Sequence, residues 1–294
     1  MELNAIRSGN RMLIDGKAVA SEKKEKLIRD IASLRSETGI VPSMRLISVG
    51  GDDSSASYIR SKMRYGKKLG VNVELTELGE KTTEEELGKV ISGFSADSST
   101  NGIVIEAPLP PHLDHTGIAQ RIDPQKDIDC ITEINQGKIA LNREYMLPAT
   151  AQAIRTLIEL QEPERGSTVT IINRSPVIGR PLALMLLNRD FTVSVCHSRT
   201  HDIPKITRES DFIVVGVGKA GFLTPDHVTG NSIVIDAGIN YANGKLTGDA
   251  DFESIKDKVK AITPVPGGVG PVTTACMFEN LLKAARAQMK NFVD

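Results

Sequence analysis

Apolar positions in the first half of the chain alternate between helical and strand spacing. Leu27, Ile31 and Leu34 recur at intervals of three and four, and the pattern stops at Gly39, which predicts a helix over about residues 17 to 38. The runs MRLISVG, VNVELTEL and GIVIEAPLPP predict three strands, and the intervening YIRSKMRYGKKLG and TTEEELGKVISGF predict helices. Strands that alternate with helices indicate a parallel sheet with helices on both faces.

The same rhythm resumes in the second half after a break. Residues 123 to 148 have weak periodicity and many turn formers, so we expect a connection or a site-bearing loop there. Ile154, Leu157 and Ile158 then predict a helix that links two lobes. Beyond it, TVTII, TVSVC, DFIVVGV and SIVIDAGI predict further strands, and a final amphipathic helix surrounds Met277, Phe278, Leu281 and Leu282.

The pattern therefore predicts an α/β protein of two lobes. We assign residues 1–148 to an N-terminal α/β domain, which a C-terminal helix over residues 275–294 completes. Residues 149–274 are assigned to a Rossmann-type parallel-sheet domain, and a cleft is expected between the two lobes. A chain of 294 residues is long enough for two such cores.

Composition excludes several classes of partner. Lysine and arginine total 36 against 37 acidic residues, so no global basic field attracts nucleic acid or an anionic membrane. Cys130, Cys196 and Cys276 are widely separated and odd in number, which indicates a reducing compartment and no structural zinc. No apolar run approaches membrane-spanning length, and the N-terminus has no signal-like apolar stretch. We expect a cytoplasmic protein without a bound metal.

Two further observations argue against a bound metal and against a phosphate-binding loop. HLDH contains His112, Asp114 and His115, but a third ligand pattern is missing, so we expect a loop or helix start there. GxxxxGK[ST] does not occur, which argues against an ATP-driven reaction.

One lysine stands apart from its neighbours on the helix that we expect to open at Ser54 or Ser55. At 100° per residue, Tyr58 and Lys62 share a sector, while the other bases of this helix fan out on roughly the opposite side. Lys62 should therefore lie at the margin of the buried face, where a lysine is usable as a proton acceptor. The alternative is an exposed pair one turn apart with no chemical task.

The second lobe opens with TVTIINRSPVIGRPLALML, a strand, a tight turn and a helix. A parallel strand that passes into a helix N-terminus directs free amides at a ligand, a favourable place for a pyrophosphate. As a glycine fingerprint the turn is weak, because Asn173 and Ser175 stand where glycines are expected and Gly179 comes one residue late. Asparagine tolerates a left-handed backbone, so the turn remains feasible.

The next strand ends in a basic, hydroxyl-bearing segment. His197, Ser198, Arg199 and Thr200 occupy the place where an NAD-selective site carries a carboxylate for the ribose. A cationic segment is suited to binding a 2′-phosphate. We expect the guanidinium of Arg174, in the first turn, to donate further hydrogen bonds to the same phosphate. These features favour NADP over NAD, with a solvated basic loop as the alternative.

The segment PVPGGVGP follows the last expected strand. Its three glycines between prolines allow a close backbone approach to a ligand while limiting the freedom of the loop. A structural tight turn is the other interpretation.

In this order, YIRSK, PQKDID, NRSPVIGRP, CHSRT, DAGIN and ITPVPGGVGP resemble the bifunctional methylenetetrahydrofolate dehydrogenase/cyclohydrolases. The resemblance covers the chain from about residue 13 to about residue 285. It implies a folate-binding catalytic domain, a Rossmann domain that binds NADP, a tetrahydrofolate substrate and a homodimer.

Site residues follow from the same resemblance. Lys62 is similar to the family's general acid/base, Tyr58 to the tyrosine that orients it and packs on the substrate, and Asp129 to the carboxylate that holds the pterin ring. The expected substrate-binding loop contains Pro266, Gly267, Gly268 and Pro271. The expected cofactor-binding set is Asn173, Arg174, Ser175, Gly179, Ser198, Arg199, Val217 and Ile239.

The chain also departs from the family pattern. Glu106 replaces a glutamine, Cys130 a glycine after Asp129, and Asn173 the glycine that opens the cofactor turn. PATA at residues 148 to 151 replaces PCTP.

Glu106 is the departure with the clearest chemical consequence. A carboxylate beside Lys62 favours the charged form of the lysine, which makes it a worse base, and it also favours a cationic product of hydride transfer. We therefore hypothesise that NADP-dependent dehydrogenase activity persists and cyclohydrolase activity is reduced or lost. The alternative for Glu106 is a rim carboxylate satisfied by another cation or by water.

Three other functions fit parts of the pattern. A short-chain dehydrogenase also carries a tyrosine four residues before a lysine, but its cofactor turn would follow the first strand, whereas here the better dinucleotide strand lies downstream. The substitutions leave open a non-catalytic folate-binding paralogue, or an enzyme acting on a related reduced pterin.

Overall fold

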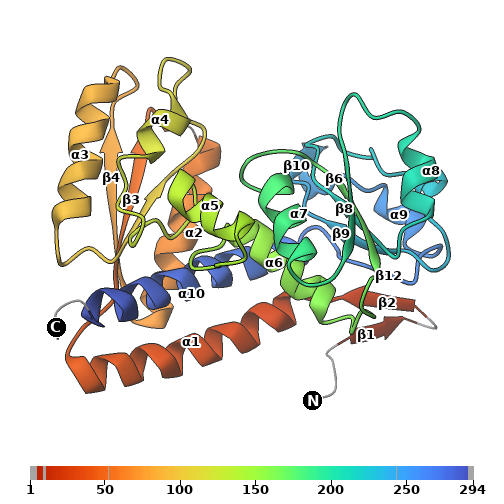
Figure 1. The fold of residues 1–294 in the computed structure, drawn as a ribbon, viewed down its shortest axis with the longest axis horizontal. Coiled ribbons are helices and arrows are strands. Elements are labelled where there is room, and N and C mark those ends of the chain that lie inside the picture. The colour runs from red at the N-terminus through yellow and green to blue at the C-terminus, as the bar shows by residue number, and fades with distance from the viewer. Residues whose placement is uncertain (1–4, 9–10, 52, 243, 291–294) are drawn as a thin grey trace. The chain divides into compact units, whose positions relative to one another are not determined.

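The computed structural model describes residues 5–8, 11–51, 53–242 and 244–290 (Figure 1). The chain divides into two compact units. The three-stranded unit comprises Lys23–Pro148 and Met277–Asp294, and the seven-stranded unit comprises Met1–Glu22 and Ala149–Cys276. Among the described residues, no helix combines the length and the apolar character needed to cross a bilayer.

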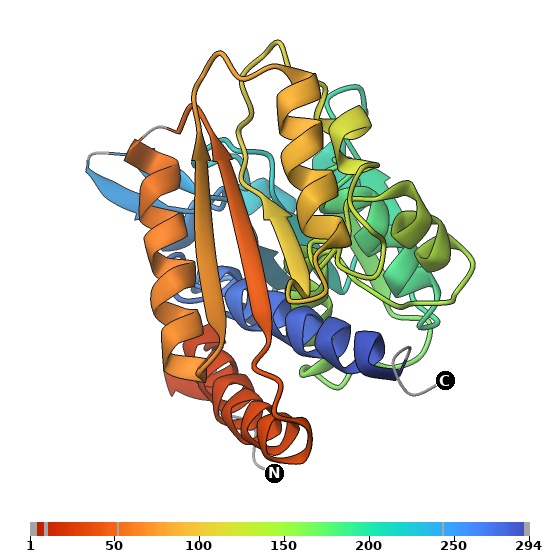
Figure 2. The same cartoon turned by 90° about the vertical axis from the view of Figure 1, so that its left-hand side faces the viewer.

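In the three-stranded unit, the parallel sheet has the order β4-β3-β5, formed by Asn72–Leu78, Ser43–Val49 and Gly102–Ile105. Helix α2 (Asp53–Leu69) follows β3, and α3 (Glu84–Ala96) follows β4, as the alternating pattern predicted. Side chains of β3 and β5 pack with Leu87 and Ile91 of α3 into one buried cluster. Figure 2 shows α2 and α3 beside this sheet.

Helices α1 (Gly16–Thr38) and α10 (Val269–Lys290) each have one end in the seven-stranded unit and the other end in the three-stranded unit. Helix α1 ends as the sequence predicted, since Gly39 has φ +75° and its amide donates to the Arg35 carbonyl at 2.8 Å. Helix α10 begins six residues earlier than expected, within the segment PVPGGVGP. The last four residues of the helix expected to reach 294 lie outside the described residues.

The seven-stranded sheet has the order β1-β2-β12-β9-β8-β6-β7. Its strands are Ala5–Ser8, Arg11–Ile14, Ala261–Ile262, Ile233–Asp236, Phe212–Val215, Thr168–Ile172 and Thr192–Cys196, in that order. All neighbours from β2 to β7 are parallel, and only the β1–β2 pair is antiparallel. Because β7 lies on one side of β6 and β8 on the other, the strand order reverses at β6, as at a Rossmann switch point.

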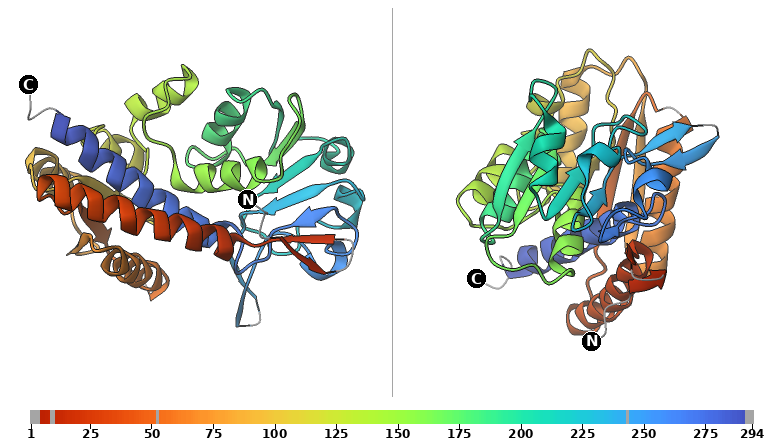
Figure 3. Two further views of the ribbon diagram at one scale, coloured as in Figure 1. Left: turned by 90° about the horizontal axis from the view of Figure 1, so that it is seen from below. Right: turned by 90° about the vertical axis from the view of Figure 1, so that its right-hand side faces the viewer.

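Helices cover the seven-stranded sheet on both faces. Helices α6 (Ala149–Glu159) and α7 (Gly179–Leu187) contact each other and the sheet. A second apolar cluster joins the sheet to α8 (Ile203–Arg208) and α9 (Phe252–Ile255). The ribbon of β10 (Asn240–Ala242) and β11 (Lys245–Thr247) stands out from this unit (Figure 3), and η1 is a short helix at Pro225–His227.

The segment 123–148, expected to be a connection or a site-bearing loop, also contains a helix. Helix α5 (Glu133–Ala140) forms within it, capped by the Thr132 side chain, which accepts from the Asn135 amide. Ile134 and Leu141 are exposed, so this short helix has no regular apolar stripe that periodicity could reveal. Upstream, Asp114 caps α4 (His115–Ala119), and the helix-start interpretation of HLDH is thereby confirmed.

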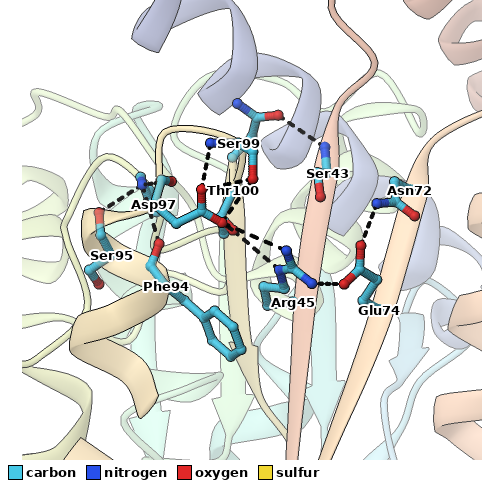
Figure 4. Close-up of polar contacts among 11 residues, drawn as sticks. Ser43, Arg45, Asn72, Glu74, Phe94, Ser95, Asp97, Ser99 and Thr100 are labelled. Carbon is cyan, nitrogen blue, oxygen red and sulfur yellow. Dashed lines mark hydrogen bonds and ion pairs between the residues drawn. The ribbon is translucent and has the colours of Figure 1, made fainter. Parts of the chain in front are cut away.

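A buried lysine fixes the end of α3. The Lys126 ammonium donates to the carbonyl oxygens of Ser95 and Asp97, each at 2.7 Å, and to that of Phe94 at 3.3 Å. Figure 4 shows this end of the helix beside Arg45, which pairs with Glu74 and Asp97. Burial lowers the pKa of Lys126, and helix-end carbonyls favour its cation.

Replacing this lysine by an apolar side chain of similar length should destabilise the protein. We expect Lys126→Met to cost about 2 kcal/mol, because charged hydrogen bonds to buried carbonyls are lost. The melting temperature should fall by roughly 4–8 °C in a thermal unfolding measurement. Lys89→Met, an exposed change on the same helix, is the control and should leave the transition in place. Equal transitions for both variants would contradict the role of Lys126.

Candidate functional site

An ion pair lies at the centre of the three-stranded unit's candidate site. The Lys62 ammonium donates to both oxygens of Glu106, at 2.7 and 2.8 Å. Glu106 follows β5 and its side chain is 7% exposed, while that of Lys62 on α2 is 22% exposed. Lys62 is thus at the margin of the buried face as predicted, and Arg60, Arg64 and Lys67 of the same helix are exposed.

Asp129 belongs to the same electrostatic cluster. It is partly buried, and burial raises the pKa of its carboxyl group. Lys62 acts in the opposite direction, whereas Asp127 and Glu106 raise this pKa further. One ammonium therefore faces two carboxylates, a charge arrangement that favours a bound cation.

Tyr58 lies one turn before Lys62 on α2, and this residue is 41% exposed. An exposed tyrosine one helical turn from Lys62 is a surface on which a flat ring can pack. The four-residue spacing from Tyr58 to Lys62 is thus realised on a helix, as the sequence indicated.

The loop before Asp129 contains two residues whose tasks the sequence did not reveal. Lys126 caps α3, as described above. The buried Asp127 carboxylate accepts from the Ile131 amide, the Thr132 amide and hydroxyl, and the Asn135 side chain, at 2.6–3.0 Å. In PQKDID, the first two charged residues therefore hold the loop, and only Asp129 faces the ion pair. Lys126 and Asp127 are both buried and Asp129 is half-buried, and such a placement of charges in a loop gives no periodic signal.

Cys130 adopts a left-handed backbone with φ 56° where the family pattern has glycine. Its thiol donates to the Met146 carbonyl at 3.2 Å and is fully buried, and burial raises its pKa. The substitution is thus accommodated within the loop, and the side chain supplies an internal contact that glycine lacks.

All candidate cofactor residues of the seven-stranded unit follow the carboxyl ends of parallel strands. Those from 173 to 179 follow β6, Ser198 and Arg199 follow β7, Val217 follows β8, and Ile239 follows β9. The edge of the sheet thereby brings together residues that are far apart in the sequence. Arg174, Ser198 and Arg199 are exposed.

The helix N-terminus in this unit differs from the expectation of free amides. The Asn173 side-chain oxygen accepts from the amides of Ser175 and Gly179, at 2.7 and 3.1 Å. Ser175 accepts two more amide hydrogen bonds, each at 3.1 Å. Its hydroxyl accepts from the Ile178 amide, and its carbonyl oxygen accepts from the Arg180 amide. Four amides around the start of α7 are therefore hydrogen-bonded within the protein, two of them because asparagine brings an acceptor that glycine lacks.

Hydrogen bonds between its own residues stabilise the turn after β7. The His197 amide donates to the Thr200 hydroxyl at 3.0 Å, and the Arg199 amide donates to the His197 ring at 3.2 Å. These contacts leave the Ser198 and Arg199 side chains exposed on a fixed turn. A hydroxyl and a guanidinium in this position form a donor set that matches a phosphate monoester.

The expected substrate loop lies in the seven-stranded unit, whereas Tyr58, Lys62 and Asp129 lie in the other. Gly267 has φ +117°, which only glycine adopts readily, and the Val265–Pro266 bond is cis. A side chain on Gly16, at the start of α1, would overlap the Gly268 carbonyl. The loop is therefore packed closely by backbone, and Pro271 lies in the first turn of α10.

The fold and the residues along the carboxyl edge define a two-unit α/β protein with a Rossmann-type nucleotide-binding sheet. The family model described as the tetrahydrofolate dehydrogenase/cyclohydrolase catalytic domain matches residues 14–129, and the model of its NAD(P)-binding domain matches residues 148–289. The chain belongs to the tetrahydrofolate dehydrogenase/cyclohydrolase family.

Individual relatives agree with this assignment. The bifunctional protein FolD of Picrophilus torridus is 47% identical over 95% of this chain and 100% of its own, and that of Bacillus subtilis is 38% identical over 93% and 97%. The crystal structure of the bifunctional 5,10-methylenetetrahydrofolate dehydrogenase/cyclohydrolase from Thermoplasma acidophilum has a TM-score of 0.89 at 46% identity, covering 95% of this chain and 100% of that one. The Trypanosoma brucei enzyme, complexed with NADP and an inhibitor, has a TM-score of 0.91 at 31% identity, with 95% and 99% covered.

Proposed function

We propose that this protein oxidises 5,10-methylenetetrahydrofolate to the 5,10-methenyl form with NADP, and that it hydrolyses the product to 10-formyltetrahydrofolate at a reduced rate. The observation that carries this proposal is the Lys62–Glu106 ion pair beside Asp129. Two carboxylates around one ammonium suit a substrate that becomes a cation during the reaction.

The first step is mainly a task of positioning and electrostatics. Asp129 accepts hydrogen bonds from the pterin ring, and Tyr58 packs on the substrate. When bound, NADP supplies the hydride acceptor. Glu106 and Asp129 then stabilise the positive charge that develops on the one-carbon bridge as the hydride leaves.

The second step needs water attack and proton transfer. Lys62 is the group assigned to this work, and it can remove a proton from water only as a free amine. Because the Lys62 nitrogen donates to both oxygens of Glu106, it is held on the carboxylate and is not free to accept a proton from water. The same ion pair therefore promotes hydride transfer and slows hydrolysis.

The cofactor preference is assigned to the exposed cations of the carboxyl edge. Arg174 and Arg199, with the Ser198 hydroxyl, fit the 2′-phosphate that distinguishes NADP from NAD. The exposed side chains of Val217 and Ile239 fit the apolar faces of the cofactor's rings. We also propose a homodimer that acts in the cytoplasm, and light scattering would measure the oligomeric state.

Purified protein with methylenetetrahydrofolate and each cofactor in turn tests the proposal. We expect NADP to be reduced with a kcat/KM at least tenfold above that for NAD. Arg174→Ala should lower kcat/KM for NADP by roughly ten- to a hundredfold and leave that for NAD unchanged, because only a charged contact to the 2′-phosphate is lost. Arg180→Ala, an exposed change on α7, is the control. The absence of reduction of either cofactor by the wild type would refute the activity.

A further inference from the structure

A buried carboxylate in the seven-stranded unit binds a whole loop. Asp249 is fully buried, and its oxygens accept from three successive amides, those of Val217, Gly218 and Lys219, with the last two at 2.9 and 2.8 Å. One of the same oxygens accepts from the Asn240 side chain at 2.8 Å. Residues 217–219 follow β8, so the carboxylate fixes a loop at the carboxyl edge of the sheet.

A second carboxylate holds Asp249 in place. Asp236, at the end of β9, accepts from the amides of Asp249 at 3.0 Å, Ala250 at 2.8 Å and Gly238 at 2.8 Å. Burial raises the pKa of Asp236, and the three amide hydrogen bonds oppose that shift. The two side chains thus tie together the loop after β8, the loop after β9 and the segment 248–250.

Glycines provide the space for this arrangement. A Cβ atom on Gly238 would overlap the Asp249 carboxylate, and one on Gly248 would overlap the Asp236 carboxylate. Close packing of this kind leaves the loops little freedom to move. The two loops carry Val217 and Ile239, which are 40% and 50% exposed although both are apolar.

The amides of residues 217–219 are also of a kind that binds anions in proteins. Successive backbone amides that point to one place form a concave site for an anion. Asp249 fills that place from within, so this loop presents an apolar side chain at the edge of the sheet and offers no pocket for a phosphate.

We propose that Asp249 is a positioning residue for cofactor binding, which holds the 217–219 loop and, through Asn240, the loop after β9 so that Val217 and Ile239 contact the rings of the nicotinamide dinucleotide. The inference rests on the proposed function, because it assigns these two side chains to the cofactor. It adds a residue that itself touches no ligand.

The test compares two carboxylate-to-amide changes at opposite ends of one sheet. Asp249→Asn replaces a carboxylate, which only accepts hydrogen bonds, by an amide whose NH2 group faces the backbone N–H donors. This change should raise the Kd for NADP, measured by calorimetry, at least tenfold. Asp211→Asn is the control: this exposed carboxylate accepts from the Thr168 amide and hydroxyl, both at 2.8 Å, at the start of β6. It should leave the Kd unchanged even where it lowers the melting temperature. A purely structural role for Asp249 would lower the melting temperature in the same way without changing the Kd.

A second variant covers the case in which Asp249→Asn does not fold. Val217→Ala changes an exposed side chain and should raise the Kd for NADP severalfold while the melting temperature stays constant. An unchanged Kd in Asp249→Asn, or in Val217→Ala if the first variant does not fold, overturns the inference. Because the readout is binding, wild-type protein that binds NADP without oxidising the folate would refute the proposed activity and leave this inference standing.

Discussion

Glu106→Gln should hydrolyse methenyltetrahydrofolate at least tenfold faster than the wild type. The Glu106 carboxylate is almost completely buried and pairs with Lys62 through both oxygens. At an effective dielectric constant of about 20, two unit charges about 4 Å apart attract by about 4 kcal/mol, and the Lys62–Glu106 contacts are shorter than that. A third of this energy corresponds to about a tenfold change in rate. Glutamine removes the charge and preserves the size of the side chain.

The same variant should transfer hydride several times more slowly. Its neutral side chain no longer stabilises the cation that forms on the one-carbon bridge. Both rates are measured on purified protein, as the decay of added methenyltetrahydrofolate and as NADPH formation from methylenetetrahydrofolate. Glu77→Gln removes an exposed carboxylate from β4 of the same unit and should change neither rate. Brisk hydrolysis by the wild type, equal to that of Glu106→Gln, would show that the ion pair does not restrain Lys62.

Lys62→Met in the Glu106→Gln background should abolish the gained hydrolysis, with a fall of about 10²- to 10⁴-fold. That range is typical for the loss of a positioned general acid or base. Hydride transfer should stay within about tenfold of the parent variant, since that step needs no proton acceptor. The two activities are again measured separately, so that loss of folding, which lowers both, is distinguished from loss of the base.

Lys68→Met supplies the comparison for this change, because Lys68 is an exposed lysine in the last turn of the same helix. It should retain the hydrolysis of its Glu106→Gln parent. If the double variant with Lys62→Met hydrolyses as fast as the parent, another group activates the water, and the assignment of Lys62 fails.

The sequence predicted much of the fold because its signals are local. Gly39 ends α1 through a left-handed backbone, and Thr83 and Glu86 form a capping box at the start of α3. The apolar runs of β3, β5, β6, β8 and β9 became parallel strands. At the site, the separation of Lys62 from its exposed neighbours follows from helical periodicity alone, and the structure agrees with it.

Other features depend on contacts between distant residues and could not be read from the chain. Strands β1 and β2 join the seven-stranded sheet through β12, whose two residues are too short to give a periodic pattern. Residues up to 22 consequently group with the second half of the chain, although the sequence suggested an N-terminal domain from residue 1.

The buried charges form the other group of features that sequence patterns did not reveal. Lys126, Asp127 and Asp249 each satisfy backbone groups, and polar residues in loops are ordinarily assumed to be solvated. Asn173 was expected to replace a glycine in a turn, but its side chain also accepts from the amides of Ser175 and of Gly179, the first residue of α7. Only three-dimensional placement distinguishes a charge that binds backbone from one that binds a ligand.

A single progress curve tests the central claim, that the Lys62–Glu106 pair beside Asp129 promotes oxidation of the folate and restrains hydrolysis. Wild-type protein is mixed with methylenetetrahydrofolate and NADP, and both NADPH and methenyltetrahydrofolate are followed over time. We expect the methenyl form to accumulate nearly in step with NADPH. If NADPH forms while the methenyl form is hydrolysed as fast as it appears, or if no NADPH forms, the claim is contradicted.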